Sequence, residues 1–324
     1  MTQRTIWTLT DDKIGMINQA LGLAEAVARI DGDWRIVEKK IAPAAPWKWL
    51  PPLLWPAGVD GVGPDGDALD PPWPDLVVSC GRTAVGPALA VKRESDRNTF
   101  IVNAQHPRIS SERFDLVVAQ SHDVLSGSNV MVIRGSLNRI TAEKLAVAAE
   151  HFRPMLADLP RPLVAVLIGG DNKVYRLTPA VTRRLADDLA RLAEAGGYGL
   201  AITPSRRTGA DNETILRERL AGSAAVVWDG VGENPYLGFL GLADAIVVTC
   251  DSVNMVSEAC STGNPVHVVD LEGGGDSKFE RFHRELRDAG VTKPFAGTIE
   301  SWSYPAMDET ERVAAEVRRR MGLA

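Results

Sequence analysis

One polar stretch, between two apolar runs, has side chains that suit the binding of a phosphate. Residues 249–263 read Thr-Cys-Asp-Ser-Val-Asn-Met-Val-Ser-Glu-Ala-Cys-Ser-Thr-Gly, and Asp251 and Ser252 are residue types that cap a helix start. The N–H groups and positive dipole end of such a helix attract anions. Helical spacing places three further candidate contacts away from the apolar face: Asn254, Met255 and Glu258. A ligand site and a capped, amphipathic helix with a solvated face both fit this pattern.

Two turns in the second half of the chain have residue types that suit phosphate recognition. The first turn follows the apolar run 163–168, and its paired glycines allow backbone N–H groups to cradle an anion. The second follows the apolar run 200–202 and has hydroxyl and guanidinium donors. The candidate contacts are Gly169, Gly170 and Asn172 in the first turn, and Ser205, Arg206 and Arg207 in the second. For the second turn, a solvated loop is the alternative interpretation.

The first half of the chain offers candidate contacts where apolar runs end. Asp12 and Gly15 follow the run 5–10, in a turn without the G-x-G-x-x-G and G-x-x-x-x-G-K-[ST] motifs, which argues against a dinucleotide site here. Gly15 either lets the backbone approach a ligand closely or serves only the turn. His106 and His122 follow later runs, and imidazole exchanges protons near neutral pH. Each histidine is either a direct contact or an ordinary surface residue.

The elements that must position these side chains alternate between short apolar strands and amphipathic helices. Several strands end in polar residues, and a parallel sheet would bring those ends to one edge, where α/β proteins bind ligands. The predicted strands are 5–10, 34–41, 75–80, 99–105, 115–120 and 129–134 in the first half, and 163–168, 200–202, 225–228, 245–248 and 266–270 in the second. The pattern therefore predicts an α/β protein with two halves of similar size and a cleft between them.

A proline-containing segment, residues 152–162, marks the expected boundary between the halves. We expect an N-terminal domain at residues 1–153 and a C-terminal domain at residues 154–307. A final helix in residues 308–324 is expected to cross back over the first domain. Because the phosphate-suited turns all belong to the second half, the sequence predicts a nucleotide or nucleotide sugar in the second domain and an acceptor in the first.

Length, composition and charge exclude several classes of protein. The 324 residues are enough for two domains, and a content of 45% hydrophobic and 24% charged residues is typical of a globular protein in water. A net charge of -6 argues against a general nucleic-acid-binding protein. No apolar run approaches the length of a membrane span, and the three cysteines lack metal-ligand spacing. We therefore expect a cytoplasmic protein with neither a metal nor a cofactor.

Residues 43–74 differ in character, since they are rich in proline and glycine and contain half of the tryptophans. The segment Trp47–Trp55 is apolar but is too interrupted by proline for a regular element. One interpretation is an exposed aromatic patch that contacts a lipid-linked acceptor or, as a peripheral protein, the inner face of a membrane. The other is a long loop folded back on the domain.

Blocks of sequence along nearly the whole chain resemble the mitochondrial-fission Elm family, which was earlier labelled "predicted nucleoside-diphosphate-sugar epimerase". The resemblance is carried by residues 7–10, 18–25, 105–108, 114–118, 168–170, 203–208 and 251–259. It implies a GT-B architecture, in which two Rossmann-like domains with parallel sheets face one another across a cleft. That plan is similar to lipid-A-disaccharide synthase and to the non-hydrolysing UDP-sugar 2-epimerases. Plant members of the family are implicated in recruiting a dynamin-related protein to mitochondria.

The resemblance also implies roles for particular residues. It implies that a donor diphosphate lies near Gly170, Ser205, Arg206 and Ser252. Glu258 would face the hydroxyls of the ribose or the sugar, where a carboxylate can accept two hydrogen bonds. One departure concerns the acidic pair Asp251 and Glu258, which are seven positions apart, whereas many GT-B transferases have two glutamates eight positions apart.

From these observations we expect a metal-independent glycosyltransferase that uses a nucleotide-diphosphate sugar. Arg206 and the helix dipole would stabilise the departing diphosphate, and a base from the first domain, Asp12 or His106, would deprotonate an acceptor hydroxyl. A nucleotide-sugar epimerase on the same fold is one alternative. A non-catalytic adaptor that binds a protein partner is another.

Overall fold

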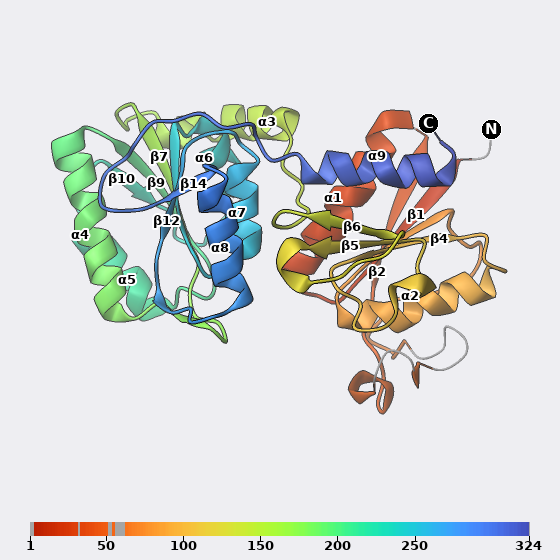
Figure 1. Cartoon of the computed structure of the whole chain (residues 1–324). Helices are drawn as coiled ribbons and strands as arrows, with labels where there is room; N and C mark the ends of the chain where they lie inside the picture. Colours follow the sequence, from red (N-terminus) through yellow and green to blue (C-terminus); the bar gives the residue numbers. More distant parts are fainter. Residues whose placement is uncertain (1–2, 32, 51–53, 56–61, 324) are drawn as a thin grey trace. The chain divides into compact units, whose positions relative to one another are not determined.

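Short, mostly β-branched runs form two parallel, six-stranded sheets in the computed structural model, which describes residues 3–31, 33–50, 54–55 and 62–323 (Figure 1). The first sheet belongs to unit 1, which comprises Met1–Arg139 and Asp308–Ala324. The second belongs to unit 2, Ile140–Met307. Each sheet has helices on both faces, so most strands are buried on both sides, as their continuous apolar runs predict.

In unit 1 the strand order is β2-β1-β3-β4-β5-β6, with every neighbouring pair parallel. The strands are β1 (Arg4–Thr10), β2 (Trp34–Lys40), β3 (Leu76–Cys80), β4 (Phe100–Ala104), β5 (Leu116–Gln120) and β6 (Val130–Ile133). The longer helices are α1 (Ile14–Asp31), α2 (Arg82–Glu94) and α9 (Glu309–Met321), and short 3-10 turns lie at Trp47–Trp49, Ser111–Arg113 and Ser121–Asp123. The order of the strands reverses direction between β1 and β3.

The C-terminal helix α9 belongs to unit 1 and lies beside α1 (Figure 1). Its apolar residues Val313, Ala314 and Val317 are fully buried in the core that α1 shares with the sheet. The N–H of Asn138 donates a hydrogen bond to Thr310 Oγ1 at 3.0 Å, at the start of the helix. A distant segment of the chain therefore completes the core of unit 1.

In unit 2 the strand order is β10-β9-β7-β11-β12-β14, again parallel throughout. These strands are β7 (Leu163–Ile168), β9 (Gly199–Pro204), β10 (Ala225–Val227), β11 (Ala245–Thr249), β12 (Val266–Val269) and β14 (Thr292–Pro294). The helices are α3 (Ala142–Phe152), α4 (Pro179–Gly196), α5 (Ala210–Arg219), α6 (Tyr236–Leu242), α7 (Val253–Cys260) and α8 (Lys278–Asp288), with a 3-10 turn at Arg153–Leu156. Two short antiparallel strands, β8 (Tyr175–Arg176) and β13 (Glu272–Gly273), pair separately.

Helix α3 lies in unit 2, whereas the sequence analysis placed its residues in the N-terminal domain. The helix packs against α6 so closely that a Cβ on Gly238 would lie 2.5 Å from the ring of Phe152. A Cβ on Gly241 would lie 2.4 Å from the carbonyl oxygen of Leu145. The missing side chains on α6 allow this contact, and no local pattern in α3 itself could have shown it.

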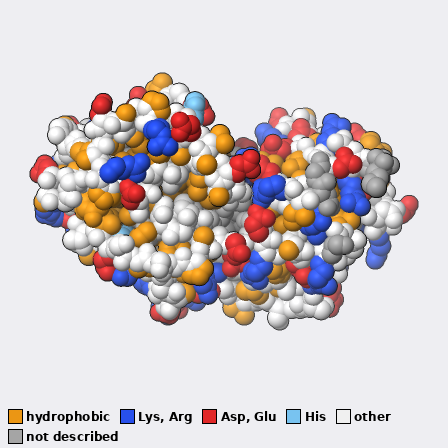
Figure 2. Space-filling view, turned by 90° about the horizontal axis from the view of Figure 1, so that it is seen from above, with side chains coloured by type: hydrophobic (Ala, Val, Ile, Leu, Met, Phe, Trp, Pro, Cys, Tyr) orange, Lys and Arg blue, Asp and Glu red, His pale blue; other side chains and the backbone are white. Residues whose placement is uncertain are grey.

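The tryptophan-containing segment is described only in part, because residues 51–53 and 56–61 lie outside the described residues. Trp49 is 68% exposed, whereas Trp55 is half-buried and its Cβ would lie 2.7 Å from a Cβ placed on Gly86 of α2. Among the helices that the structure describes, none has the length and apolar character needed to cross a bilayer. On the face drawn in Figure 2, the coloured basic and acidic side chains are interspersed, without a continuous basic stripe.

Candidate functional site

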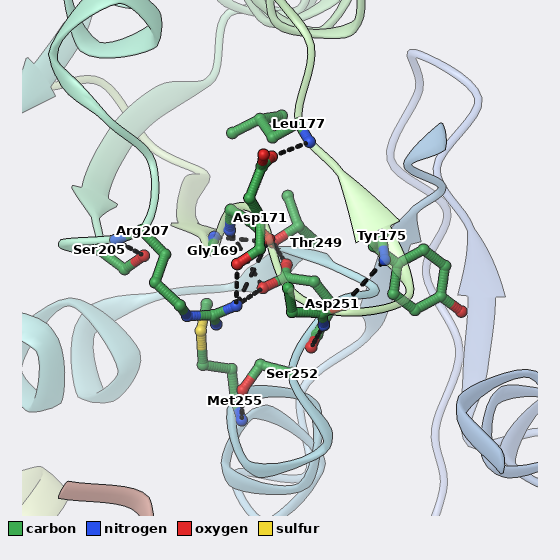
Figure 3. A network of polar contacts seen from close by, with 12 residues as sticks. Gly169, Asp171, Tyr175, Leu177, Ser205, Arg207, Thr249, Asp251, Ser252 and Met255 are labelled. Carbon is green, nitrogen blue, oxygen red and sulfur yellow. Dashed lines mark hydrogen bonds and ion pairs between the residues drawn. The ribbon is translucent and has the colours of Figure 1, made fainter. Parts of the chain in front are cut away.

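The polar turns that the sequence singled out meet at one point of the unit 2 sheet. Strand order reverses between β7 and β11, which are neighbours in the sheet although they are far apart in the chain. In open α/β sheets ligands bind at such a switch point, beyond the carboxyl ends of the strands. The loops that follow β7, β9 and β11 are joined there by hydrogen bonds (Figure 3).

The Asp251 carboxylate is the centre of this network. Its Oδ2 accepts a hydrogen bond from the Gly170 N–H at 3.0 Å and forms an ion pair with Arg207 Nη1 at 2.7 Å. Its Oδ1 accepts a hydrogen bond from the Thr249 hydroxyl at 2.6 Å. The carboxylate is fully buried, whereas the Arg207 side chain is 40% exposed. A buried charge of this kind is tolerated only because a cation and two further donors surround it.

Two threonines fix the end of β7 to the neighbouring loops. The Gly169 N–H donates to Thr249 Oγ1 at 2.8 Å, and the Gly169 carbonyl accepts from Thr208 Oγ1 at 2.6 Å. Thr249 therefore both donates to Asp251 and accepts from Gly169, so its single O–H donor is used within this network. The three loops are held in one arrangement by bonds that are mostly buried.

Close packing requires glycine at both positions after β7. A Cβ on Gly169 would lie 2.2 Å from the Asp251 carboxylate oxygens, and a Cβ on Gly170 would lie 1.9 Å from the carbonyl oxygen of Arg207. Both glycine N–H groups donate hydrogen bonds within the protein. In this structure they therefore serve the Asp251 network, and the anion cradle that the sequence predicts stays a prediction.

Asn172 connects this loop to two other segments. Its Nδ2 donates to the backbone carbonyl of Asp251 at 2.8 Å. Its Oδ1 accepts from the N–H groups of Val174 and Tyr175 at 2.7 and 2.8 Å. Because the amide is used inside the protein on both sides, the structure gives Asn172 a positioning role next to the start of α7.

Ser252 is the N-cap of α7, as the sequence predicts. Its Oγ accepts a hydrogen bond from the Met255 N–H at 3.3 Å. Asn254 and Met255 lie in the first turn of the helix and are half-buried. The positive end of the helix dipole therefore lies next to Asp251, at the same edge of the sheet as the other loops.

The two arginines that follow β9 have different surroundings. The turn is closed by a hydrogen bond from the Ser205 N–H to Thr208 Oγ1 at 3.0 Å and by one from the Arg207 N–H to Ser205 Oγ at 3.2 Å. Arg207 then turns toward Asp251. Arg206 is exposed, and within the described residues its guanidinium has neither a hydrogen bond nor an ion pair. Arg206 is therefore the cation of this turn whose charge no described side chain neutralises.

Glu258 lies one to two turns into α7 and is buried, with its Oε2 accepting a hydrogen bond from the Tyr236 hydroxyl at 2.6 Å. Burial, together with the adjacent Glu258 carboxylate, raises the pKa of Tyr236 well above its usual value. The phenol therefore stays protonated and donates to the carboxylate. Tyr236 occupies one of the acceptor sites that the family resemblance reserves for sugar hydroxyls.

Cys250, next to Asp251, is held by two residues from later segments of the chain, Leu271 and His283. Its backbone carbonyl accepts a hydrogen bond from Nε2 of the buried His283 at 2.7 Å, and its Sγ accepts from the Leu271 N–H at 3.4 Å. Burial raises the pKa of the Cys250 thiol to about 12 and lowers the pKa of His283. Both side chains are therefore neutral at pH 7, which excludes a reactive thiolate here.

Four side chains of this region escaped the reasoning from sequence: Thr208, Tyr236, Thr249 and His283. A local signal existed for the threonines, because Thr249 begins the stretch 249–263 and Thr208 ends the block 203–208, both of which the sequence singles out. The other two act through partners 22 and 33 positions away, Glu258 for the tyrosine and Cys250 for the histidine. No spacing rule connects residues at such separations.

The candidates of unit 1 lie at the carboxyl edge of its own sheet. Asp12 is exposed in the turn between β1 and α1, and Gly15 lies in the first turn of α1. His106 follows β4, and its Nδ1 accepts a hydrogen bond from the Arg108 N–H at 2.9 Å. β3 lies between β1 and β4 in the sheet, so Asp12 and His106 follow strands that are not neighbours. Because the two units are described separately, none of these residues is placed relative to Asp251.

Gln105 joins the two loops that carry these candidates. Its Nε2 donates to Gln19 Oε1 at 3.2 Å, from the end of β4 to the second turn of α1. Gln105 has a positive φ of 81°, a conformation rarely adopted by residues other than glycine. In the part of the chain that the structure describes, no group of three or more His, Cys, Asp or Glu side chains is arranged to hold a metal ion.

Comparison with protein families shows a match over most of the chain. A family model described as mitochondrial fission ELM1 matches residues 14–321. The "Mitochondrial fission protein ELM1" of Arabidopsis thaliana is 34% identical over an alignment 278 positions long, which covers 76% of this chain and 64% of that protein. The alignment with this plant relative thus spans less than two thirds of the relative's length.

Comparison with solved structures concerns the fold alone, because the sequence identities are low. A UDP-GlcNAc 2-epimerase from Methanocaldococcus jannaschii matches with a TM-score of 0.60 and 13% identity, over 97% of this chain and 99% of that one. The Medicago truncatula protein UGT71G1, complexed with UDP-glucose, matches with a TM-score of 0.52 and 12% identity, over 99% and 92%. The predicted GT-B-like α/β fold with two Rossmann-like units is confirmed.

Proposed function

The chain belongs to the mitochondrial fission ELM1 family, and we propose that it binds a nucleoside diphosphate sugar at the switch point of the unit 2 sheet. The fold supports this proposal at a coarse level, because the matched epimerase and the matched plant protein act on or bind UDP-sugars according to their names. The proposed contacts are the half-buried Ser205 and the exposed Arg206 in the turn after β9, and the start of α7 at Ser252.

One observation carries the proposal: the two adjacent arginines, Arg206 and Arg207, have different surroundings. Arg207 neutralises the buried Asp251 and thereby fixes the turn, whereas Arg206 remains exposed and without a partner among the described residues. A guanidinium held by a rigid turn loses little freedom when it binds a phosphate, and it presents paired N–H donors to it. The α7 dipole adds a second positive end at the same edge.

We propose transfer of the sugar as the reaction. Arg206 and the α7 start would stabilise the charge that develops on the departing diphosphate. A base from unit 1, Asp12 or His106, would accept the proton of the acceptor hydroxyl, and a lipid-linked acceptor would contact the segment Trp47–Trp55. Epimerisation of the sugar on the same fold is the alternative reaction. It would need an acid and a base on either side of one sugar carbon.

Calorimetric titration with UDP-, GDP- and CMP-sugars tests the binding proposal. We expect one sugar nucleotide to bind, and Arg206→Ala to weaken that binding by about tenfold to a hundredfold through loss of a charge-assisted contact. Arg184→Ala, which removes an exposed arginine from the middle of α4, is the matched control and should leave binding unchanged. Equal affinities for wild type and Arg206→Ala would reject the assignment of Arg206.

A specific observation also favours a second candidate, a GT-B-like adaptor that binds a protein partner. The N–H groups of Gly169 and Gly170 donate within the protein, and one Glu258 oxygen accepts from Tyr236. Groups that could hold a donor are thus already used. If no sugar nucleotide binds at high concentration, the adaptor is favoured. If one binds, incubation with that sugar nucleotide alone separates the two reactions, because only an epimerase would change the sugar.

A further inference from the structure

A cavity of about 370 Å³ lies in unit 1, and its lining includes none of the candidate site residues described above. It is lined on one side by the end of α2 and the turn after it, and on the other by residues 112–115. The first of these segments leads into β4 and the second into β5, so the cavity lies at the amino edge of the sheet. His106 follows the opposite, carboxyl end of β4. The cavity is therefore separate from the candidate acceptor side of this unit.

The charges around the cavity are mostly positive. The described residues that line it include the cations Lys92, Arg93, Arg97 and Arg113 and the acids Glu112 and Asp115. Lys92 and Asp115 form an ion pair with each other, and Asp115 also accepts a hydrogen bond from the Ile101 N–H at 2.7 Å. That pair is therefore neutral and has a structural role. Three arginines then face one glutamate, which leaves the lining with a net positive charge.

Arg97 and Arg113 are the cations on which a ligand would depend. Both are exposed, and in the described part of the chain neither guanidinium forms a hydrogen bond or an ion pair. They approach the cavity from different segments, one after α2 and the other before β5. Two guanidinium groups from different segments suit a phosphoryl group, whose oxygens accept paired N–H donors from more than one direction.

The backbone that carries Arg97 is held in an uncommon conformation. α2 ends with hydrogen bonds from the Asp96 N–H to the Arg93 carbonyl at 3.1 Å and from the Arg97 N–H to the Lys92 carbonyl at 2.9 Å. This is the pattern of a Schellman motif, which normally places glycine in the left-handed position. Here Asp96 has a φ of 50° and Arg97 a φ of 65°. Side chains at such positions cost free energy, so their presence at the wall of a cavity calls for an explanation.

The cavity has room and apolar surface for more than a phosphate ion. Its volume is within the range of pockets that take small molecules. Leu89 of α2 and Phe114, which is buried, contribute apolar lining. We propose that this cavity binds a phosphate-bearing small molecule, with Arg97 and Arg113 on the phosphoryl group and Leu89 and Phe114 on its apolar part. This site is independent of the proposed sugar-nucleotide site in unit 2.

Titration of the full chain with phenyl phosphate, inorganic phosphate and phenol tests this proposal. We expect phenyl phosphate to bind saturably at one site, more tightly than inorganic phosphate, and phenol not to bind. Arg97→Gln and Arg113→Gln should each weaken the binding of phenyl phosphate by about tenfold or more, because each removes a charge-assisted contact. Added salt should weaken it further, since both arginines are exposed.

Two controls separate this site from other sources of binding. Arg35→Gln removes an exposed arginine from β2, at the far edge of the same sheet, and should leave the affinity unchanged. Arg184→Gln, which removes an exposed arginine from α4 of unit 2, should also leave it unchanged. Thermal unfolding of each variant shows whether the fold is kept. Absence of saturable binding to wild type, or equal binding by wild type and Arg113→Gln, would overturn the proposal.

Discussion

Asp251 shows how a single buried charge can organise a binding edge without being open to a ligand. The sequence predicts that it lies on a polar helix face suited to contact a ligand. The structure surrounds it with Gly170, Thr249 and Arg207, so that its partners come from the protein itself. We infer that its contribution to function is indirect, through the position of the β9 turn and hence of Arg206.

This role predicts a large loss of stability for Asp251→Asn. The new amide keeps the shape of the carboxylate, but it cannot neutralise the charge of Arg207. In one orientation its NH₂ group faces the Gly170 N–H and Arg207, and in the other it faces the Thr249 hydroxyl, which donates to the carboxylate in wild type. Breaking a buried ion pair costs about 3 kcal/mol or more of unfolding free energy. Guanidinium denaturation measures the difference from wild type.

Asp187→Asn is the matched control for that measurement. Asp187 pairs with Arg219, and both side chains are about half exposed, so the loss should be no more than about 0.5 kcal/mol. Similar losses for the two variants would contradict the central role that we give to Asp251.

What the sequence revealed at this scale was the kind of residue, not its partner. Arg206 and Arg207 are equivalent in the sequence, and the resemblance favoured Arg206 for the diphosphate. Only the structure shows that Arg207 forms an ion pair with Asp251, which lies 44 positions later in the chain. Side chains that meet from loops far apart in the chain leave no trace in local spacing, and the same holds for Tyr236 of α6 with Glu258 of α7.

At the scale of elements, the N-terminal end of α7 has both a structural role and a proposed role in binding. Ser252→Ala removes its capping hydrogen bond to the Met255 N–H and should cost about 1 kcal/mol of unfolding free energy. Because the helix start would also lose its fixed position, we expect the variant to bind a sugar nucleotide more weakly than wild type. Denaturation and calorimetric titration measure the two effects.

Ser277→Ala supplies the comparison, since Ser277 caps α8 through the Glu280 N–H at the same distance of 3.3 Å. It should cost a similar unfolding free energy without changing affinity for the nucleotide. An equal loss of affinity in both variants would mean that Ser252 acts on binding only through general stability.

Elements with their own core-facing pattern could be predicted, and those without one could not. The run 163–168 coincides with β7, because a strand buried on both faces reads as continuous apolar sequence. α5 was missed because it buries just Leu216 among its described residues, and its sequence has no apolar stripe. β8 and β13 are two residues long and pair across a large sequence distance, so their existence depends on tertiary contacts.

For the molecule as a whole, two buried histidines predict a loss of stability in weak acid. Burial lowers the pKa of both His267 and His283 below the value of about 6.5 in the unfolded chain. His267 Nε2 accepts from the Glu300 N–H at 3.0 Å, and the Nδ1 of His283 has no partner among the described residues. Protonation would therefore remove an acceptor in one case and bury an unpaired N–H in the other.

The sign of the effect follows from proton counts. When pH falls below about 6.5, the unfolded chain binds protons that the folded chain does not, so the free energy of unfolding decreases. Above that pH the histidines contribute no further change. Denaturation between pH 7.5 and 5.5 should show this slope, and His283→Gln should reduce it. If the slope is the same in His283→Gln as in wild type, His283 does not contribute to the pH dependence of stability.

The division into units gives the last prediction, which concerns α9. Val313, Ala314 and Val317 lie fully buried against α1, although α9 follows all of unit 2 in the chain. A chain that ends at Met307 would expose the face of α1 that these residues cover. Burying an apolar side chain is worth about 1.5–3 kcal/mol for residues of the size of valine, so unit 1 should be strongly destabilised.

Unit 2 is continuous in sequence and its core cluster draws on residues 140–307 alone, so the same truncation should leave it folded. Hydrogen exchange separates the two outcomes within one sample. Amides of β1 and β3 should lose protection in the truncated chain, whereas those of β7 and β11 should keep it. Equal loss of protection in both sheets would show that the two units unfold together. The cooperative unfolding units would then not correspond to the two separate hydrophobic cores. Retained protection in β1 would instead mean that the sheet and α2 suffice to stabilise unit 1, and that α9 adds a cover rather than part of its core.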